Sequence, residues 1–214
     1  MDNVQPRISI IDYGVGNLFS LASSFTSVGA DVEIISDPAQ VANAQRIILP
    51  GVGAFGDAID KLRSTGMADA VISATSDGVP LLGICLGMQL LFDVSYEYGE
   101  HKGLGLIPGA VRPIAEVIDP ALKIPHIGWN ALHFVRDDNP LFAEVNEGDH
   151  VYFVHSYYAA DCEESLVATT DYSVELTAAV ARGNVYGCQF HPEKSGEIGL
   201  RIVRAFCGEG FVRC

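Results

Sequence analysis

The sequence predicts a doubly wound α/β fold in three layers, built on a mostly parallel sheet with an antiparallel β extension in the second half. In the first half, short apolar runs alternate with segments whose apolar residues recur at helical spacing. In the second half, from residue 103 to 181, short β-type runs follow one another with only turn residues between them. Strands separated by helices tend to pair in parallel, whereas strands joined by turns pair antiparallel.

The first half contains four apolar runs that are typical of buried strands and four segments that are typical of helices. The predicted strands are residues 7–14, which end in a glycine turn, 31–35, 46–51 and 79–82. The predicted helices are residues 17–28, which end at Gly29, 57–62, 67–75 and 88–92. Their alternation predicts helices on both faces of a parallel sheet, the arrangement of flavodoxin-like folds.

The second half contains a series of short β-type runs and a closing helix. Turn residues separate predicted strands at 110–114, 131–135, 150–155, 166–170 and 176–180. A late strand, 185–190, leads into His191, and residues 199–206 have the pattern of a last helix. A chain of 214 residues can build one core without a disulfide or a metal, so we expect residues 1–214 to form a single domain.

Composition and charge exclude several classes of function. The formal net charge of −14 opposes binding to nucleic acid, which needs clustered lysine and arginine. No apolar stretch approaches the roughly 20 residues of a membrane helix, and the first residues lack the pattern of a signal peptide, so we expect a cytoplasmic protein without membrane contact. The five cysteines are scattered and form no Cys-x-x-Cys pair, which indicates neither a disulfide framework nor a metal site.

The most informative motif is the run Gly-Ile-Cys-Leu-Gly at residues 83–87, between a predicted strand and a predicted helix. A nucleophile on such a tight turn adopts a strained backbone angle, and flanking glycines let the turn close. The helix N-terminus beside Cys85 offers free N–H groups and a positive dipole end, which favour a thiolate and a developing oxyanion. A cysteine between glycines is also common as a small buried hydrophobe, so the motif alone leaves both interpretations open.

A cysteine nucleophile needs a base, and the base needs a group that orients it. His191 and Cys85 each follow a predicted strand, and functional groups of open α/β sheets gather at the carboxyl ends of strands, so the two side chains can meet. Glu193 lies two residues beyond His191, across a stiff proline, and can fix the tautomer of the imidazole. The histidines without such a neighbour are interpreted as structural: His126, His133, His150 and His155.

Attack of a thiolate on a carbonyl group creates an oxyanion that backbone N–H groups can stabilise. One donor is the N–H of Leu86, directly after the candidate nucleophile. A second donor can come from the loop Pro-Gly-Val-Gly at residues 50–53, which also follows a predicted strand. Its glycines let the backbone approach a ligand and let a peptide rotate, although glycine is equally common in ordinary strand-to-helix connections.

Together, the run Gly-Ile-Cys-Leu-Gly-Met-Gln at 83–89 and the run Phe-His-Pro-Glu at 190–193 resemble the class I glutamine amidotransferases. Three further segments, at 49–55, 125–130 and 152–158, are similar to one branch of this family. The resemblance extends from about residue 8 to residue 206. It implies an enzyme that hydrolyses L-glutamine to glutamate and ammonia, without a cofactor or a metal.

The resemblance also implies a role for each residue of the pattern. Cys85 would be the nucleophile that forms a glutamyl thioester, His191 the acid and base, and Glu193 the group that orients His191. The other implied sets are the oxyanion donors Leu86, Val52 and Gly53, and the glutamine-binding residues Gln89, Glu97, Ser156 and Tyr157. Glu97 is equally compatible with a surface acid at a helix end.

In the branch that the three segments resemble, ammonia passes to a separate (β/α)₈-barrel cyclase subunit of histidine biosynthesis, in a heterodimer. The resemblance therefore implies a protein partner that meets Trp129, Asn130 and Lys194. An exposed tryptophan is a strong interface anchor, and a core position for Trp129 is the alternative. Three other functions stay open: a subunit of another class I amidotransferase, a non-catalytic binding module, and a cysteine hydrolase of other amides.

Overall fold

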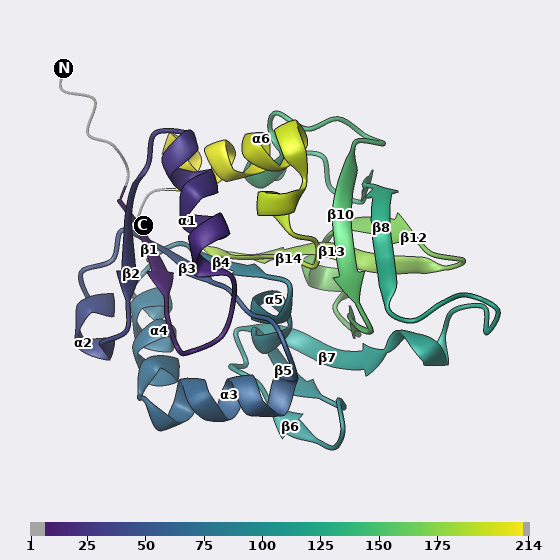
Figure 1. Ribbon diagram of the computed structural model, residues 1–214, viewed down its shortest axis with the longest axis horizontal. Helices are drawn as coiled ribbons and strands as arrows, with labels where there is room; N and C mark the ends of the chain where they lie inside the picture. Colours follow the sequence, from purple (N-terminus) through teal and green to yellow (C-terminus); the bar gives the residue numbers. More distant parts are fainter. Residues whose placement is uncertain (1–6, 212–214) are drawn as a thin grey trace.

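The computed structural model describes residues 7–211, and a twisted sheet forms the centre of the molecule (Figure 1). Within this range the sheet has eight strands in the order β2-β1-β3-β4-β14-β13-β12-β9. In that order they are Asp31–Ile35, Arg7–Ile11, Arg46–Leu49, Leu81–Ile84, Val185–Cys188, Glu175–Arg182, Leu166–Asp171 and His133–Phe134. The first five pair in parallel and the last three antiparallel, which confirms the predicted sheet with its antiparallel extension.

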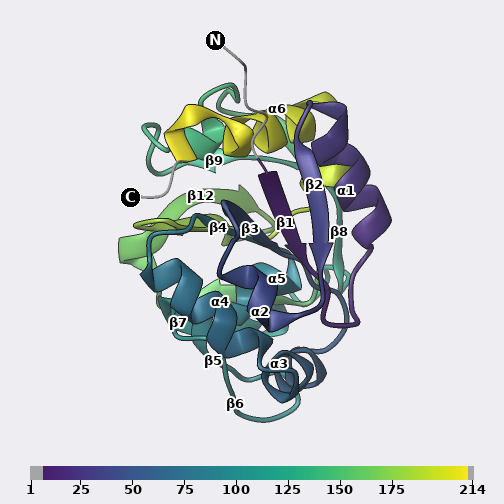
Figure 2. The same ribbon diagram turned by 90° about the vertical axis from the view of Figure 1, so that its left-hand side faces the viewer.

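Helices cover both faces of this sheet, as the alternation of elements predicts (Figure 2). One face carries α1 (Leu18–Ser27) and α6 (Gly196–Cys207). The other carries α2 (Pro38–Val41), α3 (Phe55–Ser64), α4 (Met67–Ser76) and α5 (Leu86–Leu90). Strand β3 shows the physical reason: Ile47 and Leu49 pack into one core and Ile48 into the other, so consecutive apolar residues serve both faces of the sheet.

Two smaller β units complete the fold. One is a four-stranded sheet in the order β11-β7-β5-β6, with bounds Tyr157–Ala160, Ile107–Pro113, Phe92–Ser95 and His101–Lys102. The other is an antiparallel ribbon of β8 (His126–Ala131) and β10 (His150–His155), which lies at the end of the molecule away from β2 (Figure 1). Of their strands, β7 and β10 coincide with strands predicted in the second half of the sequence.

The predicted strand at 131–135 is confirmed only in its central part, and the strand before it was not predicted. The chain instead forms β8, which ends at residue 131, and the two-residue strand β9. Strand β8 could not be recognised from the sequence because its apolar residues Ile127 and Trp129 are exposed while the polar His126 is buried. This is the reverse of the usual alternation of a half-buried strand. The short strands β5, β6 and β11 and the single-turn helix α2 were likewise not predicted, since each has too few residues for a periodic pattern.

The helix predicted at 88–92 begins earlier and is shorter than expected. Helix α5 starts directly after Cys85 and ends at Leu90, and Phe92 already belongs to β5. Helix α6 starts three residues before the predicted position 199. The remaining helical turns are the 3₁₀ segments Ile114–Glu116, Pro140–Phe142, Glu163–Ser165, Pro192–Lys194 and Glu209–Phe211. None of the helices within residues 7–211 has the length and apolar character needed to span a bilayer.

Candidate active site

Cys85 lies on a sharp turn between β4 and α5, with a backbone φ of 55° that non-glycine residues seldom adopt. The turn closes because its neighbours have no side chain: a Cβ on Gly87 would lie 1.8 Å from the carbonyl oxygen of Leu49. A Cβ on Gly83 would lie 2.7 Å from the carbonyl oxygen of Gly87. The strained angle predicted for a nucleophile elbow is therefore present, and backbone packing enforces it.

His191 follows β14 at the carboxyl edge of the sheet and brings an imidazole to Cys85. Its Nδ1 lies 2.8 Å from Oε1 of Glu193, and only 5% of each of these two side chains is exposed. Burial lowers the pKa of His191, but hydrogen bonds and charges from Cys85 and Glu193 outweigh burial and raise this pKa to about 9. Because Nδ1 is held by Glu193, Nε2 is the ring atom left for the thiol.

A cavity of about 350 Å³ opens in front of Cys85. Its lining includes all but three of the residues predicted to form the site, namely Val52, Gly53, Cys85, Leu86, Gln89, Glu97, Ser156, Tyr157, His191 and Lys194. Glu193 lies behind His191, and Trp129 and Asn130 do not line the cavity. The volume suits a small polar ligand of amino-acid size.

The loop after β3 approaches the elbow closely. The hydroxyl of Tyr13 donates a 2.8 Å hydrogen bond to the carbonyl of Pro50, and Gly53 has a φ of +94°. Within residues 7–211, the N–H groups of Val52, Gly53 and Leu86 have no backbone hydrogen-bond partner. These groups border the cavity and are available to a ligand atom.

Two glutamines connect the thiol to the opposite wall of the cavity. Gln89 donates from Nε2 to the carbonyl of Tyr157 at 3.1 Å and to Oε1 of Gln189 at 2.9 Å. Nε2 of Gln189 in turn lies 3.9 Å from Sγ of Cys85. Sequence reasoning missed Gln189, although an amide inside an otherwise apolar strand run is itself a signal, because a buried amide needs polar partners.

Glu97 lies in the turn after β5 and not at a helix end, so the alternative of a surface acid at a helix end is wrong. It is 8% exposed, and its Oε2 accepts a 2.6 Å hydrogen bond from the N–H of Phe55. Burial raises the pKa of Glu97, against the opposing effect of that hydrogen bond. The side chain thus presents a carboxyl group with little solvent around it to the cavity.

Trp129 is 52% exposed on β8, so the alternative of a core position is wrong. Its ring packs edge to face against Tyr152, with the ring centroids 5.9 Å apart. The Nζ atom of Lys194 lies 5.8 Å from the centre of the same Tyr152 ring. Asn130 points to the opposite side of the ribbon, where its Oδ1 lies 3.0 Å from Nε2 of His126.

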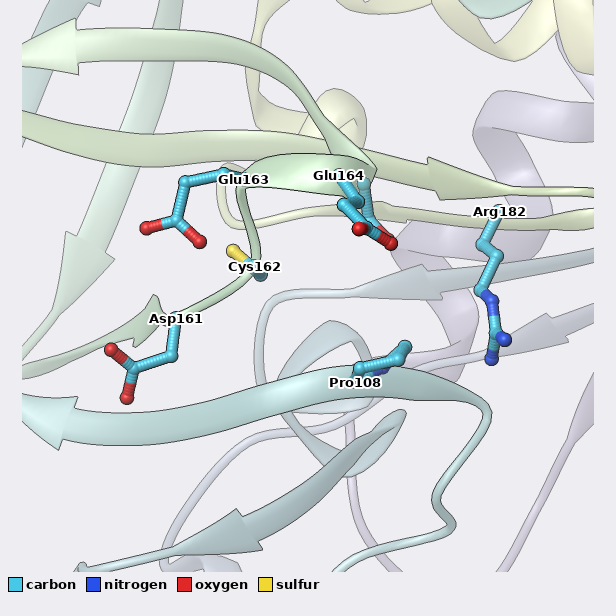
Figure 3. Close-up of a pocket in the computed structure, with 7 residues that line it drawn as sticks. Pro108, Asp161, Cys162, Glu163, Glu164 and Arg182 are labelled. Atoms are coloured by element: carbon cyan, nitrogen blue, oxygen red, sulfur yellow. The ribbon is translucent and has the colours of Figure 1, made fainter.

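A second cavity, of about 380 Å³, lies between β7 and the segment before β12 (Figure 3). Acidic side chains dominate its lining, with Asp161, Glu163 and Glu164 around Cys162. Burial raises the pKa of Cys162 to about 11, and no histidine is found among the described residues that line this cavity. It therefore lacks the pairing of a cysteine with a histidine that is found at Cys85.

Comparisons with known proteins agree with this geometry. The profile of the family "Glutamine amidotransferase class-I" matches residues 9–207. The chain is 52% identical to imidazole glycerol phosphate synthase subunit HisH of Geobacillus sp. (strain WCH70), over 93% of this chain and 95% of that protein. It is 47% identical to the protein of the same name from Caldanaerobacter subterraneus subsp. tengcongensis, over 97% of this chain and 99% of that protein.

A solved structure shares the fold at low sequence identity. PurLQS from Thermotoga maritima superposes with a TM-score of 0.74 at 21% identity, and the match covers 94% of this chain and 97% of that chain. The family profile, the two similar subunits and the elbow with its histidine and glutamate lead to one assignment. The chain belongs to the class I glutamine amidotransferase family.

Proposed function

We propose that this chain is the glutamine-hydrolysing subunit of an imidazole glycerol phosphate synthase and supplies ammonia to a (β/α)₈-barrel cyclase subunit. The observation that carries the proposal is 52% identity to such a subunit over 93% of the chain. In the proposed complex, a heterodimer, the cyclase uses ammonia to form imidazole glycerol phosphate and an aminoimidazole carboxamide ribotide in histidine biosynthesis. All of these compounds are small and soluble, and the complex works in the cytoplasm.

In the proposed reaction, Sγ of Cys85 attacks the side-chain carboxamide carbon of glutamine and forms a glutamyl thioester. His191 takes the thiol proton and gives it to the departing ammonia, and it then takes a proton from the water that hydrolyses the thioester. The 2.8 Å contact between Nδ1 of His191 and Glu193 supports these roles, because it holds the ring with Nε2 free for the thiol. A His191 pKa of about 9 supports the role of proton carrier, since the proton that the ring takes from the thiol stays on it near pH 7 until it passes to ammonia.

The oxyanion of this reaction is stabilised by the N–H of Leu86 and by the N–H groups of Val52 and Gly53. Support comes from the absence of a backbone partner for these three groups within residues 7–211, and from their position on the cavity wall. Each such donor contributes on the order of 10²–10³ in rate. Rotation of one peptide in the glycine loop would therefore switch the site between a slow and a fast form.

The substrate glutamine is held by Gln89, Glu97, Ser156 and Tyr157. The buried carboxyl group of Glu97 suits the α-ammonium group of glutamine, because a charge in a poorly solvated site favours an opposite charge. Ser156 and Tyr157 line the cavity at the start of β11, opposite Cys85. This set distinguishes glutamine from other amides by its charged end as well as by its carboxamide.

The partner binds the outer face of the β8–β10 ribbon. Trp129 lies opposite Tyr152 and Ile127 opposite Val154 in the strand register, and Ile127 and Trp129 are more than half exposed. Val154 and Lys194 also line the cavity in front of the nucleophile. An exposed apolar face thus adjoins the opening of the site, where a docked partner could receive ammonia without its release to solvent.

The proposal is tested by ammonia release from glutamine, measured with and without the cyclase subunit and its nucleotide substrate. We expect stimulation of the wild-type chain by the loaded partner, and a loss of roughly 10⁴-fold or more in the Cys85→Ala variant. Cys207→Ala is the matched control, because Cys207 is a free cysteine on α6 outside the cavity. Retained activity in Cys85→Ala would contradict the mechanism, and stimulation only by another synthase would contradict the partner.

A further inference from the structure

The reaction proposed above makes no use of two buried histidines that lie between the outer strand and the cavity. His126 on β8 and His155 on β10 are directly opposite in the strand register, and are 0% and 6% exposed. Nδ1 of His126 lies 2.9 Å from Nε2 of His155. The His126 ring is stacked between Tyr172 and Phe153, at centroid distances of 4.1 and 5.2 Å. Both rings are therefore fixed, and the hydrogen bond between them is shielded from water.

Asn130, the neighbour of Trp129 on β8, contacts the pair on the side of His126. Its Oδ1 lies 3.0 Å from Nε2 of His126, and its Nδ2 donates to the carbonyl of Asp171 at 3.0 Å. The bond to Asp171 sets the orientation of the amide, so that oxygen and not nitrogen faces the imidazole. Asn130 thus connects the partner-facing strand to the buried pair.

The carbonyl of Tyr157, at the wall of the cavity, contacts the pair on the side of His155. It accepts from Nδ1 of His155 at 2.8 Å and from Nε2 of Gln89 at 3.1 Å. Gln89 continues through Gln189 to the thiol of Cys85. A continuous set of hydrogen bonds therefore runs from the ribbon to the nucleophile, and His155 itself lines the cavity.

We propose that His126 and His155 are positioning residues, which hold the Tyr157 carbonyl in the glutamine pocket at a position set by the amide of Asn130. The part of this inference that concerns the cyclase rests on the proposed function, because it assigns the outer face of β8 to that partner. The part that concerns glutamine binding needs only the contacts of the chain itself.

The protons of the pair show how Asn130 acts on it. The oxygens of Asn130 and Tyr157 each require an N–H donor from one of the two rings. The contact between the rings requires a third N–H group. A neutral pair carries only two N–H groups, and burial lowers the pKa of both rings, that of His155 to about 4. With the amide as it stands, a neutral pair leaves one of the three contacts without a proton.

Rotation of the Asn130 amide by half a turn removes this deficit. Nδ2 of Asn130 then donates to His126, His126 donates to His155, and His155 donates to the Tyr157 carbonyl. The cost is the bond from Asn130 to Asp171. The pair therefore has two discrete arrangements, and only the rotated one supplies an N–H donor to all three contacts of the rings in the neutral state.

The titratable groups around the pair come from several elements. Tyr172 stacks on His126 from the turn after β12, and its hydroxyl donates to the carbonyl of Lys123. The groups that share the cavity with His155 are Cys85, Glu97, Tyr157, His191 and Lys194. The charge of His191 further lowers the pKa of His155, so protonation of the catalytic imidazole favours the neutral pair.

The first test compares glutamine kinetics of His126→Gln and His155→Gln with a control, His150→Gln. His150 lies on the same ribbon but is exposed, outside the set of contacts. We expect a rise of about tenfold in KM for glutamine in the first two variants, because one hydrogen bond to the pocket wall is lost. We also expect a smaller stimulation by the cyclase, with the control unchanged in both. A KM and a stimulation within twofold of wild type in both variants would overturn the inference.

The second test uses Asn130→Asp and ¹⁵N spectra of the full chain with labelled histidine. A carboxylate facing His126 stabilises the third proton, so the pair should stay protonated to a pH about one unit higher than in wild type. An unchanged titration would mean that the side chain at position 130 does not set the protonation of the pair, and that result would overturn the inference. Wild-type chain that is not stimulated by the cyclase would contradict the proposed function only, since KM and the titration still report on the pair.

Discussion

The elbow at Cys85 and the β8–β10 ribbon border the same cavity, but different forces hold them in place. At the elbow, backbone packs against backbone, and a Cβ on Gly87 would meet the Leu49 carbonyl at 1.8 Å. In the ribbon, side-chain hydrogen bonds such as that between His126 and His155 set the geometry. Cys85 can therefore move only with its strand and helix, whereas the cavity wall opposite can change by exchange of hydrogen-bond partners.

The largest expected effect comes from adding a methyl group to the elbow. Gly87→Ala should lower the free energy of unfolding by about 3 kcal/mol, because a Cβ would overlap a backbone carbonyl that cannot move without β3. Gly183→Ala is the control, since Gly183 has a φ of +58° but open space around it, and should cost about 1 kcal/mol. Urea unfolding of both variants measures the difference. An equal loss of unfolding free energy in Gly87→Ala and Gly183→Ala would show that the elbow is not held by backbone packing.

A smaller effect is expected at the outer face of the ribbon. Trp129→Ala should weaken binding of the cyclase about 30-fold, equivalent to about 2 kcal/mol, because an exposed aromatic anchor is lost. Its effect on the stability of the isolated chain should be small, since half of the side chain is exposed. Titration calorimetry against the cyclase measures the affinity. Ile34→Ala, on the opposite edge strand β2, is the control, and equal affinities of the two variants would place the interface elsewhere.

The smallest effect is a change in the pH dependence of stability that His191 causes. The pKa of His191 rises from 6.5 to about 9, so its contribution to stability is complete below pH 6.5 and is lost as the pH rises through 9. Glu193→Gln removes one cause of this rise and should flatten the decline between pH 6.5 and 9. The midpoints of urea unfolding of the wild type and of Glu193→Gln, determined across this pH range, measure the decline in stability. Parallel curves would mean that Glu193 does not stabilise the charged imidazole.

The parallel half of the fold was predictable because its central strands are buried on both faces and contain consecutive apolar residues, as residues 47–49 do. Strand β8 of the ribbon was not, because Ile127 and Trp129 face outward and the polar residues of β8 face inward. The same inversion explains why His126 and His155 were interpreted only as structural. Their partners lie on other strands, and no local pattern marks a hydrogen bond between two elements.

The sequence by itself determined the family, the elbow around Cys85, and the run from His191 to Glu193, because each depends on residues adjacent in the chain. Only the tertiary structure decided that Gln189 reaches the thiol and that Trp129 is exposed. It also decided that the two buried histidines join β8 to the cavity. The physical reason is one of range: glycine sterics and tight turns act over a few residues, whereas burial and hydrogen bonds depend on which strands the fold brings together.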